Sequence, residues 1–184
     1  MVKFQATRRG HCHFSRRTVS GKGQRGSTWV SEPGKNLTTS ILLKPHFLSI
    51  AQQFALSATV AIAVVNWLKR KTEQDVTVKW PNDIYVGNKK IVGILIENKL
   101  KGNKIEASIV GIGININQVN FDTATTITSL AVLTNKADYV IKDLAVELLI
   151  VSKRSITTSS PNPGSLYWTA IMSHYFGKIR NAHF

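Results

Sequence analysis

The sequence has little cysteine and no long apolar run, and each shortage excludes a class of protein. Cys12 is the single cysteine among 184 residues, so an intramolecular disulfide framework and a multi-cysteine zinc site are excluded. The longest uninterrupted apolar stretch, residues 60–65, is far shorter than the roughly 18 residues that span a membrane. The basic N-terminus has no apolar segment behind it, which argues against a secretory signal. We therefore expect a cytoplasmic protein with no membrane partner.

Acidic residues are missing from both ends of the chain, although the net charge of +14 is large. Residues 1–31 carry seven lysines and arginines, residues 152–184 carry four, and neither segment has an acidic residue. Residues 32–151 carry 13 basic and 10 acidic residues, as an ordinary globular surface does. A basic arm binds nucleic-acid phosphates without sequence preference, so a basic nucleic-acid-binding protein is one alternative. The balanced central part favours a globular domain with no specific nucleic-acid partner.

Apolar residues recur at three- and four-residue spacing in two segments, which predicts two helices. The first covers residues 47–71 and ends in a cationic turn, which suits the negative end of the helix dipole. Its predicted apolar face consists of Phe47, Ile50, Ala51, Phe54, Ala58, Ala61 and Val65. The second helix covers residues 138–151, with an apolar face of Val140, Ile141, Leu144, Leu148 and Val151.

Apolar runs rich in valine and isoleucine predict strands at residues 38–43, 76–80, 84–86, 91–97 and 105–117. Gly87 and Asn88 predict a two-residue hairpin turn, and residues 99–103 predict another turn. The predicted fold class is therefore α/β of the α+β type, with a mixed, largely antiparallel sheet and flanking helices. Residues 1–18 show no period and are expected to be poorly structured. The predicted core is residues 19–151, followed by a divergent tail at residues 152–184.

Three closely spaced glycines, Gly21, Gly23 and Gly26, formally match the dinucleotide-binding fingerprint. That fingerprint requires an apolar strand before it, a helix after it and an acidic residue about 20 positions further on. None of these is found here, so the match is coincidental. Glycines nevertheless let backbone N–H groups approach a ligand, and Lys22 and Arg25 add positive charge, a combination that suits a phosphate. A mobile basic turn is the alternative interpretation.

Polar groups gather at strand ends in two further segments. Residues 79–83 place an amine, an amide and a carboxylate together, as ligand sites do, although this composition also makes an ordinary turn. Lys90 opens an otherwise apolar strand in which Gly93 indicates a close approach to the backbone. Gly111 and Gly113 repeat this theme on the last strand, as two small residues on one face beside the Asn115 amide.

These segments together resemble the three signature blocks of the biotin–protein ligases. The blocks are GKGQRGSTW at residues 21–29, KWPNDIYV with KKIVGILIE within residues 79–97, and VGIGININ at residues 110–117, in that order. The resemblance covers about residues 19–150. It implies the class II synthetase-like catalytic domain that biotin and lipoate ligases share, and the phrase KWPND favours biotin over lipoate.

The resemblance implies an activity in which biotin and MgATP form biotinyl-5′-AMP. Biotin then passes to a lysine of a biotin carboxyl carrier protein or domain. ATP and Mg²⁺ are the implied cofactors, biotin is the substrate, and a homodimer is compatible with the family.

By position, the resemblance assigns catalytic roles to Lys90, Arg25 and Lys79. Lys90 would reach the biotin carboxylate or the bridging phosphoryl oxygens, and Arg25 would face phosphate. The substrate- and nucleotide-binding positions are Gly21, Lys22, Gly23, Gln24, Gly26, Trp29, Asn82, Asp83, Gly93, Gly111 and Asn115. Of these, Trp29 would wall the nucleotide pocket, and Gly93 and Gly111 would leave room for the biotin rings. Asp83 is also the candidate metal ligand.

The two ends depart from the family pattern. The family carries a Ser-Thr pair well before the glycine loop and a glutamine just ahead of it, whereas residues 16–20 read RRTVS. We also expect no SH3-like domain after the core. The departures coincide with the segments that hold most of the excess charge, which suggests a fragment or altered termini. A catalytically impaired fragment or pseudo-enzyme of the same fold is therefore the second alternative.

Overall fold

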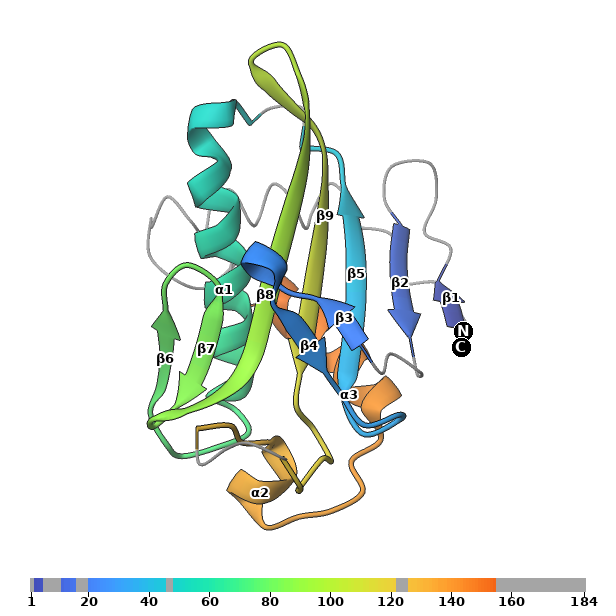
Figure 1. The fold of residues 1–184 in the computed structure, drawn as a ribbon, viewed down its shortest axis with the longest axis vertical. Coiled ribbons are helices and arrows are strands. Elements are labelled where there is room, and N and C mark those ends of the chain that lie inside the picture. The colour runs from blue at the N-terminus through green and yellow to red at the C-terminus, as the bar shows by residue number, and fades with distance from the viewer. Residues whose placement is uncertain (1, 5–10, 16–19, 46–47, 122–125, 155–184) are drawn as a thin grey trace.

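The structure is a computed structural model that describes residues 2–4, 11–15, 20–45, 48–121 and 126–154 (Figure 1). One sheet of seven strands dominates it, in the order β1-β2-β5-β9-β8-β7-β6, and every neighbouring pair is antiparallel. In chain order its strands are β1 (Val2–Phe4), β2 (His11–Ser15), β5 (Leu37–Leu43), β6 (Val76–Lys79), β7 (Asp83–Val86), β8 (Lys89–Lys101) and β9 (Lys104–Ile114). The predicted α/β class with a largely antiparallel sheet is confirmed.

The remaining elements lie on the two faces of this sheet. The helices are η2 (Ile50–Gln52), α1 (Gln53–Leu68), α2 (Leu130–Thr134) and α3 (Ile141–Arg154). A separate hairpin consists of β3 (Ser20–Lys22), the short helix η1 (Gln24–Gly26) and β4 (Thr28–Val30). Figure 1 shows α1 and α3 behind the sheet and the β3–β4 hairpin in front of β5, β8 and β9. The helices thus leave one sheet face to this hairpin.

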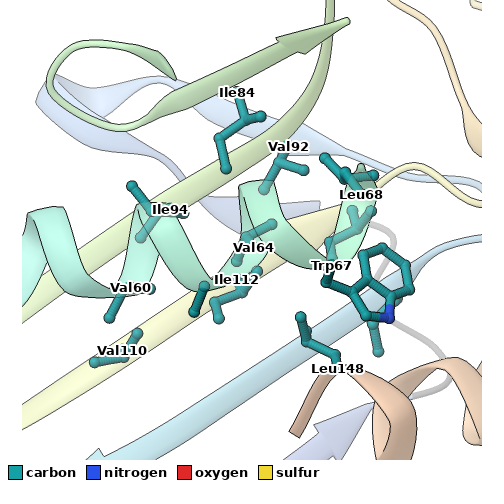
Figure 2. Packing of buried hydrophobic residues seen from close by; sticks show 14 of the residues in the cluster. Val60, Val64, Trp67, Leu68, Ile84, Val92, Ile94, Val110, Ile112 and Leu148 are labelled. Carbon is teal, nitrogen blue, oxygen red and sulfur yellow. The ribbon is translucent and has the colours of Figure 1, made fainter. Parts of the chain in front are cut away.

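The core forms between α1, α3 and the covered face of the sheet (Figure 2). Val92 and Ile94 of β8 lie directly opposite Ile114 and Ile112 of β9, so all four share one face. Figure 2 shows Val60, Val64, Trp67 and Leu68 of α1 packing over Ile84, Val92, Ile94, Val110, Ile112 and Leu148. Trp67, near the end of α1, is fully buried beside Leu148 (Figure 2).

The buried face of α1 differs from the predicted one. Leu56, Val60, Val64 and Trp67 are buried at helical spacing, whereas Phe54 is 59% exposed. Of the predicted apolar face, only Ala61 is buried among the residues whose side chains are described, and Phe47 lies outside them. The prediction was wrong because α1 carries apolar residues on all its sides. The spacing of apolar residues therefore did not determine which side of the helix faces the sheet.

The segment Ile50–Leu68 is long and apolar enough, by length and composition alone, to cross a membrane. Its apolar character has a structural cause, because the α1 residues that face the sheet form the core. Ser49 starts the segment with a capping box: its backbone N–H donates to Gln52 Oε1 at 3.0 Å. The helix therefore begins later than the predicted residue 47.

The second predicted helix is observed as α3, three residues further along than expected. Leu144 and Leu148 are buried as predicted and Ile141 packs partly against the core, but Val140 is 59% exposed. The side chain of Val151 lies outside the described part. Lys71 forms an ion pair with Glu147, which ties the end of α1 to α3.

Two corrections concern the strands. Within residues 1–18, expected to be poorly structured, β1 and β2 are strands, and β2 pairs with β5 from His11↔Leu42 to Ser15↔Thr38. A strand that pairs with β5 forms backbone hydrogen bonds whatever its side chains are. The lack of alternating apolar and polar residues in this segment was therefore misleading. The turn predicted at residues 99–103 is confined to Gly102 and Asn103, because Lys101 pairs with Lys104. The other residues of 1–18, and nearly all of the predicted tail from residue 155 on, lie outside the described residues.

Candidate functional site

One row of residues crosses the sheet face that carries the hairpin. Strand register places Lys79 opposite Asp83, Asp83 opposite Gly93, Gly93 opposite Gly113, and Gly113 opposite Thr38. Directly opposite residues in antiparallel strands share a face. Three predicted site residues, Lys79, Asp83 and Gly93, are therefore aligned on β6, β7 and β8, on the face away from α1.

A β-bulge brings Lys90 to this row. Ile84 pairs with Val92 but Tyr85 pairs with Lys90, so Ile91 is left without a partner in β7. The Lys90 side chain consequently points to the same face as Asp83, and its Nζ forms an ion pair with Asp83 Oδ1 at 2.7 Å. The two side chains are 29% and 20% exposed, so neither charge is fully solvated.

The backbone of Lys90 is fixed from the opposite side by the segment that follows β9. Its N–H donates to the Thr126 carbonyl at 2.8 Å, and its carbonyl accepts from the Thr128 N–H at 2.9 Å. Asn115 holds this segment in turn, because its buried side-chain amide donates to the Thr128 carbonyl at 3.1 Å. In this arrangement Asn115 supports Lys90, while its predicted contact with nucleotide and metal stays a prediction.

Trp29 lies on the glycines of the row. A Cβ added at Gly113 would lie 2.7 Å from Trp29 Cε2, and one at Gly93 would lie 3.0 Å from Trp29 Cζ3. Only glycine at both positions therefore lets the indole rest on the sheet. Lys90 Nζ lies 5.9 Å from the centre of the indole, within the range of a cation–π contact.

The structure shows what each glycine contacts within the chain, while the predicted roles of Gly93 and Gly111 toward biotin stay predictions. The space above Gly93, expected to take the biotin rings, contains the indole of Trp29 in this structure. A Cβ at Gly111 would meet the Leu95 carbonyl oxygen at 3.5 Å, an ordinary contact, so no close approach requires glycine there. The sequence shows Gly113 as a small residue on the same strand face as Gly111, and the structure places it opposite Gly93, under the indole.

The predicted glycine loop is the turn of the β3–β4 hairpin. Gly21 pairs with Trp29, and the Gly23 N–H donates to the Ser27 carbonyl at 2.7 Å. A Cβ at Gly23 would come within 2.8 Å of that carbonyl oxygen, and Gly26 has a φ of +82°, so both positions require glycine. The loop contains only the short helix η1, which begins at Gln24, and the chain then enters β4. No α-helix therefore follows the loop, and the dinucleotide-binding fingerprint is excluded. The side chains of Lys22 and Arg25 lie outside the described part of the structure.

The residues from Lys79 to Asp83 join β6 to β7 as a turn that also faces the site. Lys79 is exposed, and its Nζ lies 5.3 Å from the centre of the Tyr85 ring. The Asn82 carbonyl accepts a hydrogen bond from the Ile94 N–H at 2.8 Å, which fixes the turn against β8. The turn and ligand-site interpretations of this segment are therefore compatible.

Asp83 is the only predicted metal ligand, and the carboxylate available there is its own. Within the described ranges, no group of three or more His, Cys, Asp or Glu side chains comes together. The Asp83 carboxylate is already paired with Lys90. The geometry fits a metal that arrives with phosphate ligands of its own, because Mg²⁺ commonly takes one or two protein carboxylates plus substrate phosphates.

Known proteins resemble this chain in sequence. Residues 1–115 match the model of the biotin/lipoate A/B protein ligase family. The bifunctional ligase/repressor BirA of Bacillus subtilis (strain 168) is 34% identical over 100 residues, which are 54% of this chain and 30% of that protein. The human biotin–protein ligase is 33% identical over 109 residues, 56% of this chain and 15% of that protein. The chain thus spans about a third or less of the length of these relatives.

Solved structures resemble it in fold. Biotin protein ligase from Aquifex aeolicus in complex with biotin and ATP aligns with a TM-score of 0.65 and 28% identity, covering 91% of this chain and 66% of that one. Biotin protein ligase from Leishmania major in complex with biotin has the same fold, with a TM-score of 0.65 and 23% identity, covering 95% of this chain and 74% of that one. The sequence blocks, the antiparallel sheet and the family match over more than half of the chain agree. The chain belongs to the biotin/lipoate A/B protein ligase family, and its fold is that of a biotin protein ligase catalytic domain.

Proposed function

We propose that this chain is the catalytic part of a biotin–protein ligase that forms biotinyl-5′-AMP from biotin and MgATP and then biotinylates a lysine of a biotin carboxyl carrier protein or domain. The observation that carries the proposal is the meeting of the glycine hairpin, Trp29 and the Lys90–Asp83 pair on one sheet face. The relatives are named as biotin–protein ligases, and one similar structure holds biotin and ATP. Both support the choice of substrates.

The first step joins two anions, and this explains the need for Lys90. A biotin carboxylate oxygen attacks the α-phosphorus of ATP, the bond from that phosphorus to the bridging oxygen breaks, and pyrophosphate leaves with the electron pair. Charge repulsion between carboxylate and triphosphate opposes the approach. A fixed ammonium group offsets it without reorganisation at the moment of reaction. Lys90 is held by its backbone and by Asp83, so its charge is oriented before the substrates bind.

The hairpin contributes position and shelter. Its turn carries the basic residues Lys22 and Arg25, whose charge suits a phosphate, and Trp29 supplies an aromatic surface beside Lys90. Holding both reactants in line removes translational and rotational freedom from the step. Asp83 is the carboxylate that would hold a Mg²⁺ ion bound to the ATP phosphates, and such an ion would offset their negative charge.

The second step uses the good leaving group made in the first. The acceptor lysine amine attacks the acyl carbon of biotinyl-5′-AMP, the bond from that carbon to the phosphate oxygen breaks, and AMP departs. The acceptor lysine approaches from the sheet face opposite α1, since that is where Lys90 and Trp29 lie.

A direct assay tests the proposal. The purified chain is incubated with biotin, MgATP and a biotin carrier domain, and the product is detected by streptavidin blotting. Biotin-dependent pyrophosphate release measures the first step alone. We expect Lys90→Ala to lower that release about a hundredfold, the scale of losing one key electrostatic contact in a site. The matched control is Lys99→Ala, because Lys99 is 74% exposed on the β8–β9 ribbon and contacts Glu106 rather than the site.

Each outcome decides between stated alternatives. Pyrophosphate release that Lys90→Ala leaves unchanged would refute the role of Lys90. No turnover by the unaltered chain, together with biotin or ATP binding measured by calorimetry, would favour the impaired pseudo-enzyme. Neither turnover nor binding of either substrate would refute the proposed function. The cytoplasmic location and a homodimer stay predictions, testable by fractionation and by sedimentation.

A further inference from the structure

A buried polar cluster lies at the base of the hairpin. Its members are Ser31, Asn36 and Gln118, whose exposures of 4%, 4% and 7% are unusual for polar side chains. The Asn36 amide nitrogen donates to Gln118 Oε1 at 2.6 Å and to Ser31 Oγ at 3.0 Å. The cluster therefore joins the connection between β4 and β5 to the segment that follows β9.

Hydrogen bonds to backbone groups complete the cluster and fix the orientation of its side chains. Asn36 Oδ1 accepts from the Ile116 N–H at 3.0 Å, and Gln118 Oε1 also accepts from the Glu32 N–H at 3.1 Å. Beside them, the Asn117 N–H donates to the Lys35 carbonyl at 2.8 Å. Because hydrogen bonds require both distance and angle, this set fixes orientation where an apolar contact would fix only proximity.

The cluster lies between the two halves of the site. On one side, the chain runs from Ser31 back through β4 to Trp29. On the other side, Ile116 follows Asn115, whose amide holds Thr128, which in turn holds the backbone of Lys90. Hydrogen bonds and short covalent connections thus link the hairpin to the strand that bears the lysine.

The rest of the hairpin has a different kind of attachment to the sheet. Trp29 rests on Gly93 and Gly113, but its indole Nε1 is buried and has no hydrogen-bond partner in the described part of the chain. This apolar contact holds the indole close to the sheet but does not fix the orientation of the ring. Direction has to come from the base, where Ser31 lies two residues after Trp29.

We propose that Asn36, together with Ser31 and Gln118, positions the glycine hairpin and Trp29 against Lys90. Asn36 is a positioning residue here, since it acts through the hairpin and not on the substrate. Its kinetic consequence rests on the proposed function, whereas its structural consequence does not.

Amide hydrogen exchange measured by mass spectrometry tests the structural part, because local opening raises exchange only in the segment that opens. We expect Asn36→Ala to raise exchange in residues 20–30 by about tenfold, the effect of leaving buried polar groups unsatisfied. Exchange in β8 and β9 should stay as in the unaltered chain. The matched control is Ser108→Ala, which removes the hydrogen bond of another buried serine, from Ser108 Oγ to Asn98 Oδ1 at 2.7 Å, away from the hairpin.

Ser31→Ala provides a milder change if Asn36→Ala does not fold. It removes a single acceptor from the Asn36 amide, and we expect about a threefold rise in exchange over residues 20–30. In both variants kcat for adenylate formation per folded molecule, with the folded fraction measured by circular dichroism in the same sample, should fall more than the KM for biotin rises. A general loss of stability would lower only the folded fraction. Gln118→Ala combined with Asn36→Ala should raise exchange by less than the product of the two single effects, because the two substitutions share the 2.6 Å bond from Asn36 to Gln118.

The results separate the two proposals. Exchange over residues 20–30 that is unchanged in folded Asn36→Ala, or in Ser31→Ala where the former does not fold, would overturn the positioning role. The same follows if Ser108→Ala raises exchange there equally. If the unaltered chain has no ligase activity, the proposed function fails, and hydrogen exchange still decides the role of Asn36.

Discussion

Replacing Gly113 with alanine should release Trp29 from the sheet. The added Cβ would lie 2.7 Å from Trp29 Cε2 and 3.0 Å from its Cζ2 and Nε1, closer than carbon atoms approach without repulsion. Gly113 lies next to the last residue of β9 but is paired to both β5 and β8, so the backbone is held on both sides. The indole is half-buried and attached to a two-stranded hairpin, so it is the part that moves.

The magnitude follows from the contact that is lost. Ordinary carbon contacts lie at about 3.5–4.0 Å, so the ring must rise by about 1 Å or turn away. An aromatic side chain buries about 150–250 Å² in a well-packed site. Losing about 80 Å² of apolar burial at about 25 cal/mol per Å² costs about 2 kcal/mol. That free energy corresponds to roughly a thirtyfold increase in the open form of the hairpin, since 1.4 kcal/mol is about a factor of ten.

Gly111→Ala is the matched control, because it adds the same methyl group two residues away on the same strand and face. Its Cβ would meet the Leu95 carbonyl oxygen at 3.5 Å and the Leu95 Cβ at 3.9 Å, which are both ordinary contacts. Amide exchange over residues 20–30 should rise about thirtyfold in Gly113→Ala and stay close to the unaltered value in Gly111→Ala. Equal exchange in the two variants, with both folded, would refute the seating of Trp29 on Gly113.

Three further substitutions test the helix and the ion pair. Leu56→Ala should lower the free energy of unfolding by about 2–5 kcal/mol, because Leu56 is fully buried, whereas Phe54→Ala should cost about 1 kcal/mol or less at a position 59% exposed. Urea unfolding measures both, and the reverse order would contradict the observed phase of α1. Asp83→Asn keeps the shape of the side chain but removes the partner charge of Lys90, so adenylate formation should fall about tenfold. Pyrophosphate release checks this, and an unchanged rate would show that Lys90 is positioned by its backbone alone.

The strands could be predicted better than the face of α1. Strand positions depend on local patterns of valine, isoleucine and turn glycines, and those patterns place β5 to β9 within a few residues. The buried face of α1 depends on what packs against it. Residues 60–65 are apolar without interruption, so the helix has no polar side to mark its outside. Only the sheet and α3 decide that Val60 and Val64 point inward while Phe54 contacts Trp80, with ring centres 4.6 Å apart.

In the candidate site, too, local sequence features could be predicted, and contacts between distant segments could not. Lys79, Asp83, Lys90 and Gly93 could be chosen from the sequence because charged residues and glycines are unexpected in apolar strands. Asn36 could not, because an asparagine between a turn and a strand is common and its partner Gln118 lies 82 residues away. The contact that gives Gly113 its importance likewise joins segments that are distant in the sequence.

The sheet explains why the signature blocks are separated as they are. Asp83, Gly93 and Gly113 lie in one row, each on its own strand, and Lys90 joins them only because a bulge adds one residue to β8. The side-chain period of a strand is two residues, so a slip of one position would turn Gly93 toward α1 and bring an isoleucine or valine under Trp29. The turns between the strands tolerate changes in length, whereas the phase of each strand does not. A deletion of one residue inside β8 should therefore abolish the site, while a one-residue insertion at Gly102 and Asn103, at the far end of the β8–β9 ribbon, should leave Lys90 and Trp29 in place.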